Sequence, residues 1–210
     1  MSYNITPGAI RFNTDSMKLE YYRGGPVGFG TLAAGEWVQI TTDSPDIQTG
    51  GTRGLSMGGH PANNTIDYIT VSTTGNATNF GDLNNAVLTG GALASRTRGL
   101  YFGGEQAPGT QINVIDFVTI ASTGNASDFG DVSAGSLAQG TSGVCNGTRG
   151  INMGGYRAPA KLNEISYVTV AQQGNTVDFG NLITARDSVR GCASSTRGIA
   201  SGGMLSLIHI

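Results

Sequence analysis

The sequence has few of the residues on which common catalytic and structural sites depend. Its 210 residues include two cysteines, two histidines and one tryptophan, so neither a disulfide scaffold nor a Cys/His metal cluster is expected. Charged residues make up only 12% of the chain and the net charge is −2, which argues against a nucleic-acid partner and against acidic disorder. No apolar run approaches the roughly 18 residues of a membrane span. We therefore expect no cofactor and no membrane insertion.

The amino terminus also lacks the features of a secretory signal. The first residues, MSYNITPGAIRF, contain neither a basic segment nor a continuous apolar segment, so we expect a protein made in a cytoplasm. Glycine, by contrast, is abundant, with 34 residues, well above the usual share of about 7%.

Internal repetition is the strongest feature that is present. The tripeptide Thr-Arg-Gly begins at Thr52, Thr97, Thr148 and Thr196, and each copy leads through a short apolar stretch to a Gly-Gly pair. A second segment occurs three times, as TIDYITVSTTGNATNFGDL, VIDFVTIASTGNASDFGDV and EISYVTVAQQGNTVDFGNL. A period of roughly 45–50 residues indicates an array of similar structural units.

Each unit is predicted to contain several short strands. The segment 66–71 is rich in β-branched and aromatic residues, with Ile66 and Tyr68 on one face and Ile69 and Val71 on the other. A strand that is apolar on both faces must be covered on both faces. Face-to-face stacking of sheets, one from each repeat, would provide that cover. The Gly-Asn and Phe-Gly steps are expected to form turns, with the phenylalanines in the core.

An arginine, a short apolar strand, a Gly-Gly pair and a strand with an aromatic residue together resemble kelch repeats. The resemblance covers residues 43–204 and implies an all-β fold of kelch-like β-propeller blades, about three and a part. Closed propellers have roughly four to eight blades, so we expect either an open, truncated array or a four-bladed ring that the amino-terminal strands complete. The usual kelch tryptophan is absent, and Phe80, Phe129 and Phe179 are expected in its place.

Residues 1–42 do not repeat and are predicted to form a small β-hairpin module. The stretch GAIRFNTDSMKLEYY…GEWVQI resembles a segment of bacteriophage tail-fibre-like proteins, and the repeats resemble those of large virion proteins of marine and cyanobacterial phages. Residues 205–210 leave the repeat pattern and match the translated end of a sequencing-library transposon, which indicates read-through; a divergent terminal cap is the alternative.

The repeat arginines are the main candidate site residues. In one interpretation Arg53, Arg98, Arg149 and Arg197 form a row of guanidinium groups that binds an anionic glycan or a phosphate. In the other they are structural and hold carbonyl groups or repeat carboxylates, among them Asp67, Asp116, Asp82 and Asp131. Repetition in every unit favours the structural interpretation.

Other candidate groups have simpler explanations. His60 is expected to be a solvated loop residue, and Cys145 and Cys192 are expected to be two small buried thiols rather than a disulfide. The sets Asn76, Asn79, Asp82 and Asn125, Asp128, Asp131 are expected to form Asx turns rather than a calcium site.

These observations favour a non-enzymatic virion structural protein, a tail-fibre or appendage component that contacts a host-surface glycan or protein or neighbouring virion subunits. Localisation in the virion follows, and a homo-oligomer is left open. The alternatives are a cellular kelch-type protein-interaction module and a glycan-cleaving propeller that would use Glu105 and Glu164. The segments after the Gly pairs, HPANN, EQAPGTQIN and YRAPAKLN, vary most between units and are the predicted contact loops.

Overall fold

The computed structural model describes residues 7–14, 18–23, 27–28, 31–32, 36–39, 52–107, 109–133 and 139–205. The chain divides into two compact units, Met1–Pro45 and Asp46–Ile210, which are described separately. The described residues form strands and turns but no helix, so they contain no helix that could cross a membrane. The predicted all-β class is confirmed for this part of the chain.

The amino-terminal unit contains a three-stranded antiparallel sheet of the order β1-β2-β5. Its strands are β1 (Ile10–Asn13), β2 (Lys18–Arg23) and β5 (Glu36–Gln39), and a small pair is formed by β3 (Val27–Gly28) and β4 (Thr31–Leu32). Within the described residues these strands pair only with one another.

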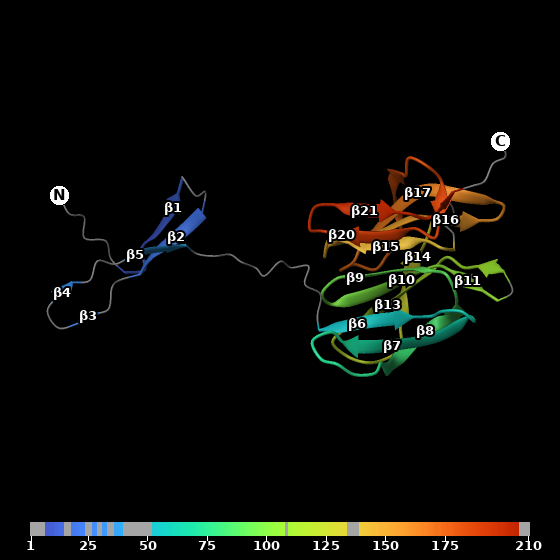
Figure 1. Ribbon diagram of the computed structural model, residues 1–210, viewed down its shortest axis with the longest axis horizontal. Helices are drawn as coiled ribbons and strands as arrows, with labels where there is room; N and C mark the ends of the chain where they lie inside the picture. Colours follow the sequence, from blue (N-terminus) through green and yellow to red (C-terminus); the bar gives the residue numbers. More distant parts are fainter. Residues whose placement is uncertain are drawn as a thin grey trace. The chain divides into compact units, whose positions relative to one another are not determined.

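The repeat unit is a series of antiparallel layers (Figure 1). The first layer consists of β6 (Arg53–Met57), β7 (Asn63–Thr70) and β8 (Thr78–Val87). The second layer consists of β9 (Gly91–Ala94), β10 (Arg98–Phe102), β13 (Val114–Thr119) and β14 (Ser127–Asp131). A hairpin of β11 (Glu105–Gln106) and β12 (Thr110–Gln111) projects from the second layer.

The third layer repeats the second, and the fourth repeats only its first two strands. The third layer consists of β15 (Ser142–Cys145), β16 (Arg149–Arg157), β17 (Ala160–Thr169) and β18 (Val177–Asn181). The fourth layer is β20 (Arg190–Ala193) with β21 (Gly198–Ser201), beside a short pair of β19 (Arg186–Asp187) and β22 (Met204–Leu205). Residues 206–210 of the predicted read-through segment lie outside the described residues.

The Phe-Gly step is a β-bulge at the same place in each of the first three layers. In the first layer Ile66 pairs with Gly81 and Asp67 with Asn79, so Phe80 is the extra residue of the bulged strand. The other two layers repeat this register shift. Gly81 has a φ of +156°, a conformation that residues with a Cβ rarely adopt. The bulge replaces the simple turn that the sequence predicts, and it directs Phe80 and Phe129 into the interior. Phe179, which is 49% exposed, does not lie in the core as expected.

Two hydrophobic clusters lie between successive layers. Ile66, Phe80 and Leu83 of the first layer pack with Val118 of the second. Their repeat equivalents in the second layer pack with Val168 and Val170 of the third. Both faces of β13 are therefore covered, as the pattern of apolar residues predicts.

The Gly-Gly pairs do not have the same place in every layer. Gly58 follows β6 and Gly103 follows β10, where each ends a strand as predicted. In the third layer Gly154 and Gly155 lie inside β16, where the ladder with β17 shifts register. No closed ring of sheets is present among the described residues.

Candidate functional site

Three of the four repeat arginines, Arg98, Arg149 and Arg197, are placed by a polar residue three positions earlier. Ser95 Oγ accepts a hydrogen bond from Arg98 N at 3.1 Å, Asn146 Oδ1 accepts one from Arg149 N at 2.8 Å, and Ser194 Oγ accepts one from Arg197 N at 3.2 Å. Serine and asparagine form such local turns readily. The turn reverses the chain, so the arginine stands at or just before the start of the next strand of the layer.

The arginine side chain lies over an aromatic ring of its own layer. The guanidinium carbon is 4.8 Å from the ring centroid for Arg53 and Tyr68, 4.9 Å for Arg98 and Phe117, and 4.5 Å for Arg149 and Tyr167. These distances are those of a cation–π contact.

Two of the arginines also bind the following layer. Arg53 Nη1 donates a hydrogen bond of 2.7 Å to the carbonyl oxygen of Ile120. Arg98 Nη1 donates one of 2.9 Å to the carbonyl oxygen of Val170. None of the ion pairs in the described ranges involves a repeat arginine. Arg53 and Arg98 thus hold carbonyl groups rather than the repeat carboxylates.

The Gly-Asn turn supplies a second set of bonds between layers, which the sequence did not reveal. Gly124 N donates to the carbonyl oxygen of Phe80 at 2.8 Å, and Asn125 Oδ1 accepts from Asp82 N at 3.1 Å. The next interface repeats these bonds with Gly174, Asn175 and their partners. The recurrence of Asn after Gly was the available signal, but a local turn explains it equally well.

A buried carboxylate joins the first layer to the second. Asp116 is only 5% exposed and accepts hydrogen bonds from Asn84 N at 3.0 Å and Asn84 Nδ2 at 2.6 Å. Burial raises the pKa of Asp116, and the two hydrogen bonds from Asn84 oppose that rise. In the third layer Ser166 takes the same position, so this link is made only once.

Arg149 and Arg197 lie together at the end of the stack. They line a cavity of about 150 Å³ with Phe179, Ile151 and Gly198. Arg149 keeps its aromatic contact, but the carbonyl acceptor that Arg53 and Arg98 find in the following layer has no counterpart here among the described residues. The repeat arginines are therefore equivalent in sequence but not in surroundings.

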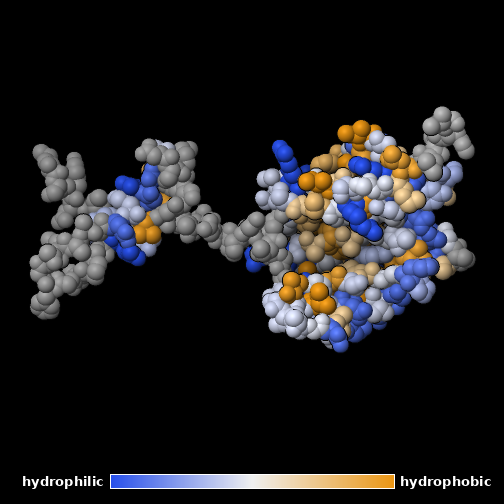
Figure 2. Space-filling view, in the orientation of Figure 1, coloured by the Kyte–Doolittle hydropathy of each residue, from blue (hydrophilic) through white to orange (hydrophobic). Residues whose placement is uncertain are grey.

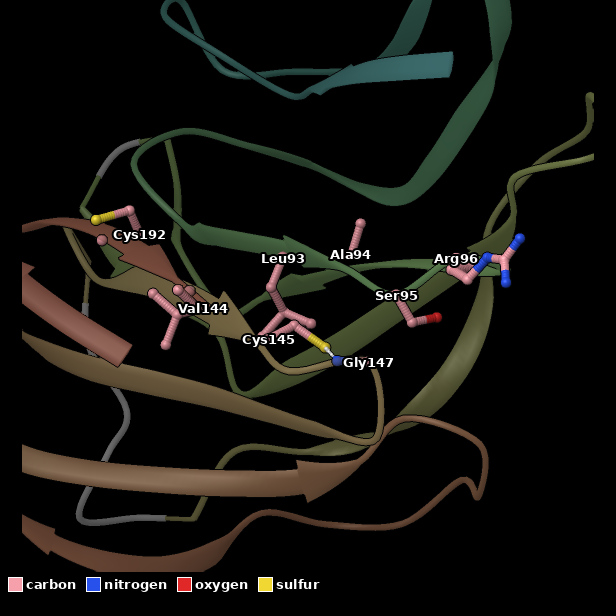
Figure 3. Close-up of a pocket in the computed structure, with 11 residues that line it drawn as sticks. Leu93, Ala94, Ser95, Arg96, Val144, Cys145, Gly147 and Cys192 are labelled. Carbon is pink, nitrogen blue, oxygen red and sulfur yellow. Dashed lines mark hydrogen bonds between the residues drawn. The ribbon is translucent and has the colours of Figure 1, made fainter. Parts of the chain in front are cut away.

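The two cysteines line a different cavity, of about 230 Å³, between β9, β15 and β20. In Figure 3 the Cys145 sulfur points toward Gly147, whose N donates to it at 3.2 Å, while Cys192 points to the other side. Both thiols are free, but the predicted burial is wrong for Cys192, which is exposed, while Cys145 is partly buried. Burial raises the pKa of Cys145, which disfavours the thiolate and therefore nucleophilic chemistry.

The remaining candidates have ordinary structural surroundings. His60 is exposed in the loop between β6 and β7. Asp128 Oδ1 accepts from Gly130 N at 3.1 Å, as an Asx turn requires. No cluster of three or more His, Cys, Asp or Glu side chains suited to a metal occurs in the described part of the chain. Glu105 lies in β11, and Glu164 lies in β17, where Ser133 Oγ donates to it at 3.5 Å.

In comparisons with known proteins, no family model and no curated protein matches the chain.

Proposed function

We propose that the protein is a non-enzymatic bacteriophage virion component of the tail-fibre or appendage type, in which kelch-like layers carry binding loops. The observation that carries this proposal is the contrast between a repeated frame and unlike loops. The frame uses the same arginine, glycine and asparagine bonds at successive interfaces. The loops after the Gly pairs differ in length and composition, which is typical of surfaces that bind partners on a rigid scaffold.

The hairpin of the second layer is also bonded to both neighbouring layers. Gln106 Nε2 of the second layer donates to Asn85 Oδ1 of the first at 2.9 Å. Gln111 Nε2 donates to the carbonyl oxygen of Tyr156 in the third at 2.6 Å. Their tips, among them His60, Ala107 and Arg157, are exposed. A partner could therefore contact several loops at once, which suits a host-surface glycan or protein or a neighbouring virion subunit.

The test has two arms. Antibody against the protein should label the tail or appendages of phage particles in electron micrographs, and the flanking genes should encode capsid and tail proteins. Purified protein should compete with phage adsorption, and replacing residues 157–160 with Gly and Ser should abolish that competition without changing the melting temperature. Unlabelled particles and metabolic gene neighbours would instead favour the cellular interaction module.

A further inference from the structure

Three polar side chains of the third layer are buried without a partner for one of their oxygen atoms. Thr141 Oγ1, Asn152 Oδ1 and Ser166 Oγ have no hydrogen-bond partner in the described part of the chain. The surface of the repeat unit carries both hydrophilic and hydrophobic side chains (Figure 2), and these three lie beneath it: Asn152 is 2% exposed, Thr141 is 5% exposed and Ser166 is fully buried. Because a buried polar group without a hydrogen bond destabilises a protein, each of these atoms requires one.

The strand register and a glycine place the three atoms close to one another. Asn152 of β16 pairs directly with Ser166 of β17, so the two side chains project from the same face of the sheet. A Cβ on Gly91 of the second layer would lie 2.5 Å from Thr141 Oγ1 and 2.9 Å from Asn152 Oδ1. These two oxygens therefore lie near each other, opposite Gly91, at the interface between the second and third layers.

The preceding interface has longer side chains at two of these positions, and they bond to the protein. Tyr101 takes the repeat position of Asn152 and pairs with Asp116, which takes that of Ser166. Tyr101 Oη accepts a hydrogen bond of 2.9 Å from Gly90 N. Asp116 accepts two hydrogen bonds from the first layer. In the third layer a phenol and a carboxylate are thus replaced by shorter groups whose oxygens find no protein donor or acceptor.

We infer that the interface between the second and third layers binds a water molecule that bridges Thr141, Asn152 and Ser166. The two hydroxyl groups can donate or accept a hydrogen bond, whereas the amide oxygen can only accept. Water can donate to the amide oxygen and bond to both hydroxyl groups, and a buried water typically forms about three such bonds. Three neutral oxygens are too few for a calcium ion, which takes six to eight ligands. The inference does not depend on the virion assignment.

A high-resolution crystal structure of the full chain is the first test. It should show one solvent peak within hydrogen-bond distance of at least two of the three oxygens. The absence of such a peak, for instance because Asn152 Nδ2 bonds directly to Thr141 Oγ1, would overturn the inference. A heavier peak with oxygen ligands at about 2.3–2.6 Å would also overturn it, in favour of a cation.

Oxygen-17 magnetic relaxation dispersion, which counts long-lived bound water molecules in solution, is the second test. The double variant Thr141→Gly, Asn152→Tyr is the probe. It transplants Gly90 and Tyr101 from the preceding interface, and their hydrogen bond should replace the water. The count should therefore fall by about one. An unchanged count in the folded double variant would contradict the inference, and the crystal structure decides the matter should this variant not fold.

Ser142→Ala is the matched control for the loss of a buried hydroxyl group. Ser142 is 8% exposed, but its Oγ would lie 2.8 Å from a Cβ on Gly191 and thus faces the fourth layer instead. This variant should keep the wild-type count of long-lived water molecules, and circular dichroism should show that it is folded. Loss of one water in Ser142→Ala, with no loss in the double variant, would place the water at the other interface and overturn the inference.

Discussion

Arg98 Nη1 donates a 2.9 Å hydrogen bond to the carbonyl oxygen of Val170, 72 residues further along the chain. The bond links the second layer to the third, and the same guanidinium lies over Phe117 within its own layer. One side chain thus fixes both the start of a strand and the position of the next repeat.

Removing this side chain should destabilise the repeat unit. Arg98→Ala loses a charged hydrogen bond and a cation–π contact, so the free energy of unfolding should fall by about 2 kcal/mol. Denaturant unfolding followed by circular dichroism measures the change. Arg197→Ala is the control, because Arg197 is exposed and should shift the free energy of unfolding by less than about 0.5 kcal/mol. Equal effects of the two variants would contradict the assigned role of Arg98.

The bulge glycines provide a test of the stacking itself. Gly130 and Gly180 occupy the same repeat position with φ of +148° and +140°. A Cβ on Gly130 would lie 2.5 Å from the carbonyl oxygen of Gly174, whereas a Cβ on Gly180 would meet nothing within 4 Å. The backbone strain of alanine is common to both sites, so Gly130→Ala should cost about 1–3 kcal/mol more stability than Gly180→Ala. Denaturant unfolding of the two variants decides the matter.

The strands of the repeat unit could be predicted from the sequence, but the bonds between its layers could not. The spacing of Thr-Arg-Gly and the apolar alternation in 66–71 predict strands, and β7 contains most of that segment. The two-sided burial of β13 also follows from its pattern. The bonds between layers could not be predicted, because the partners of Asn125 and Asn175 lie more than 40 residues away in the sequence. Nor could the sequence show that equivalent residues such as Phe80 and Phe179 differ in burial.

The buried carboxylate should make stability depend on pH. Since the folded-state pKa of Asp116 is raised above 3.8, its favourable contribution is present below that value and is lost as the pH rises through the raised pKa. The stability of the wild type relative to Asp116→Asn should therefore fall as the pH rises above 3.8 and through the raised pKa of Asp116. Denaturant unfolding across this range measures the difference. Asp67→Asn is the matched control for the loss of one charge, and a difference that rises with pH would contradict the assignment.

The amino-terminal unit should respond to pH in the opposite sense. Glu20 accepts hydrogen bonds from Asn13 and Arg11, and these lower its pKa below 4.5. Its ionised form therefore contributes stability above that value, and the contribution is lost as the pH falls through the lowered pKa. Trp37, the single tryptophan of the chain, has the Arg11 guanidinium 4.2 Å from its ring and reports on this unit. Acid titration of its fluorescence should show a transition that Glu20→Gln shifts or removes.

Hydrogen exchange at three equivalent glycines tests the layered arrangement most directly. Gly124 N and Gly174 N each donate to the preceding layer at 2.8 Å, whereas Gly75, at the same repeat position in the first layer, has no such acceptor among the described residues. Residue-resolved exchange should show slow, matched rates at Gly124 and Gly174 and a rate at Gly75 close to that of an unprotected amide. Fast exchange at all three positions would contradict the stacking of the repeats.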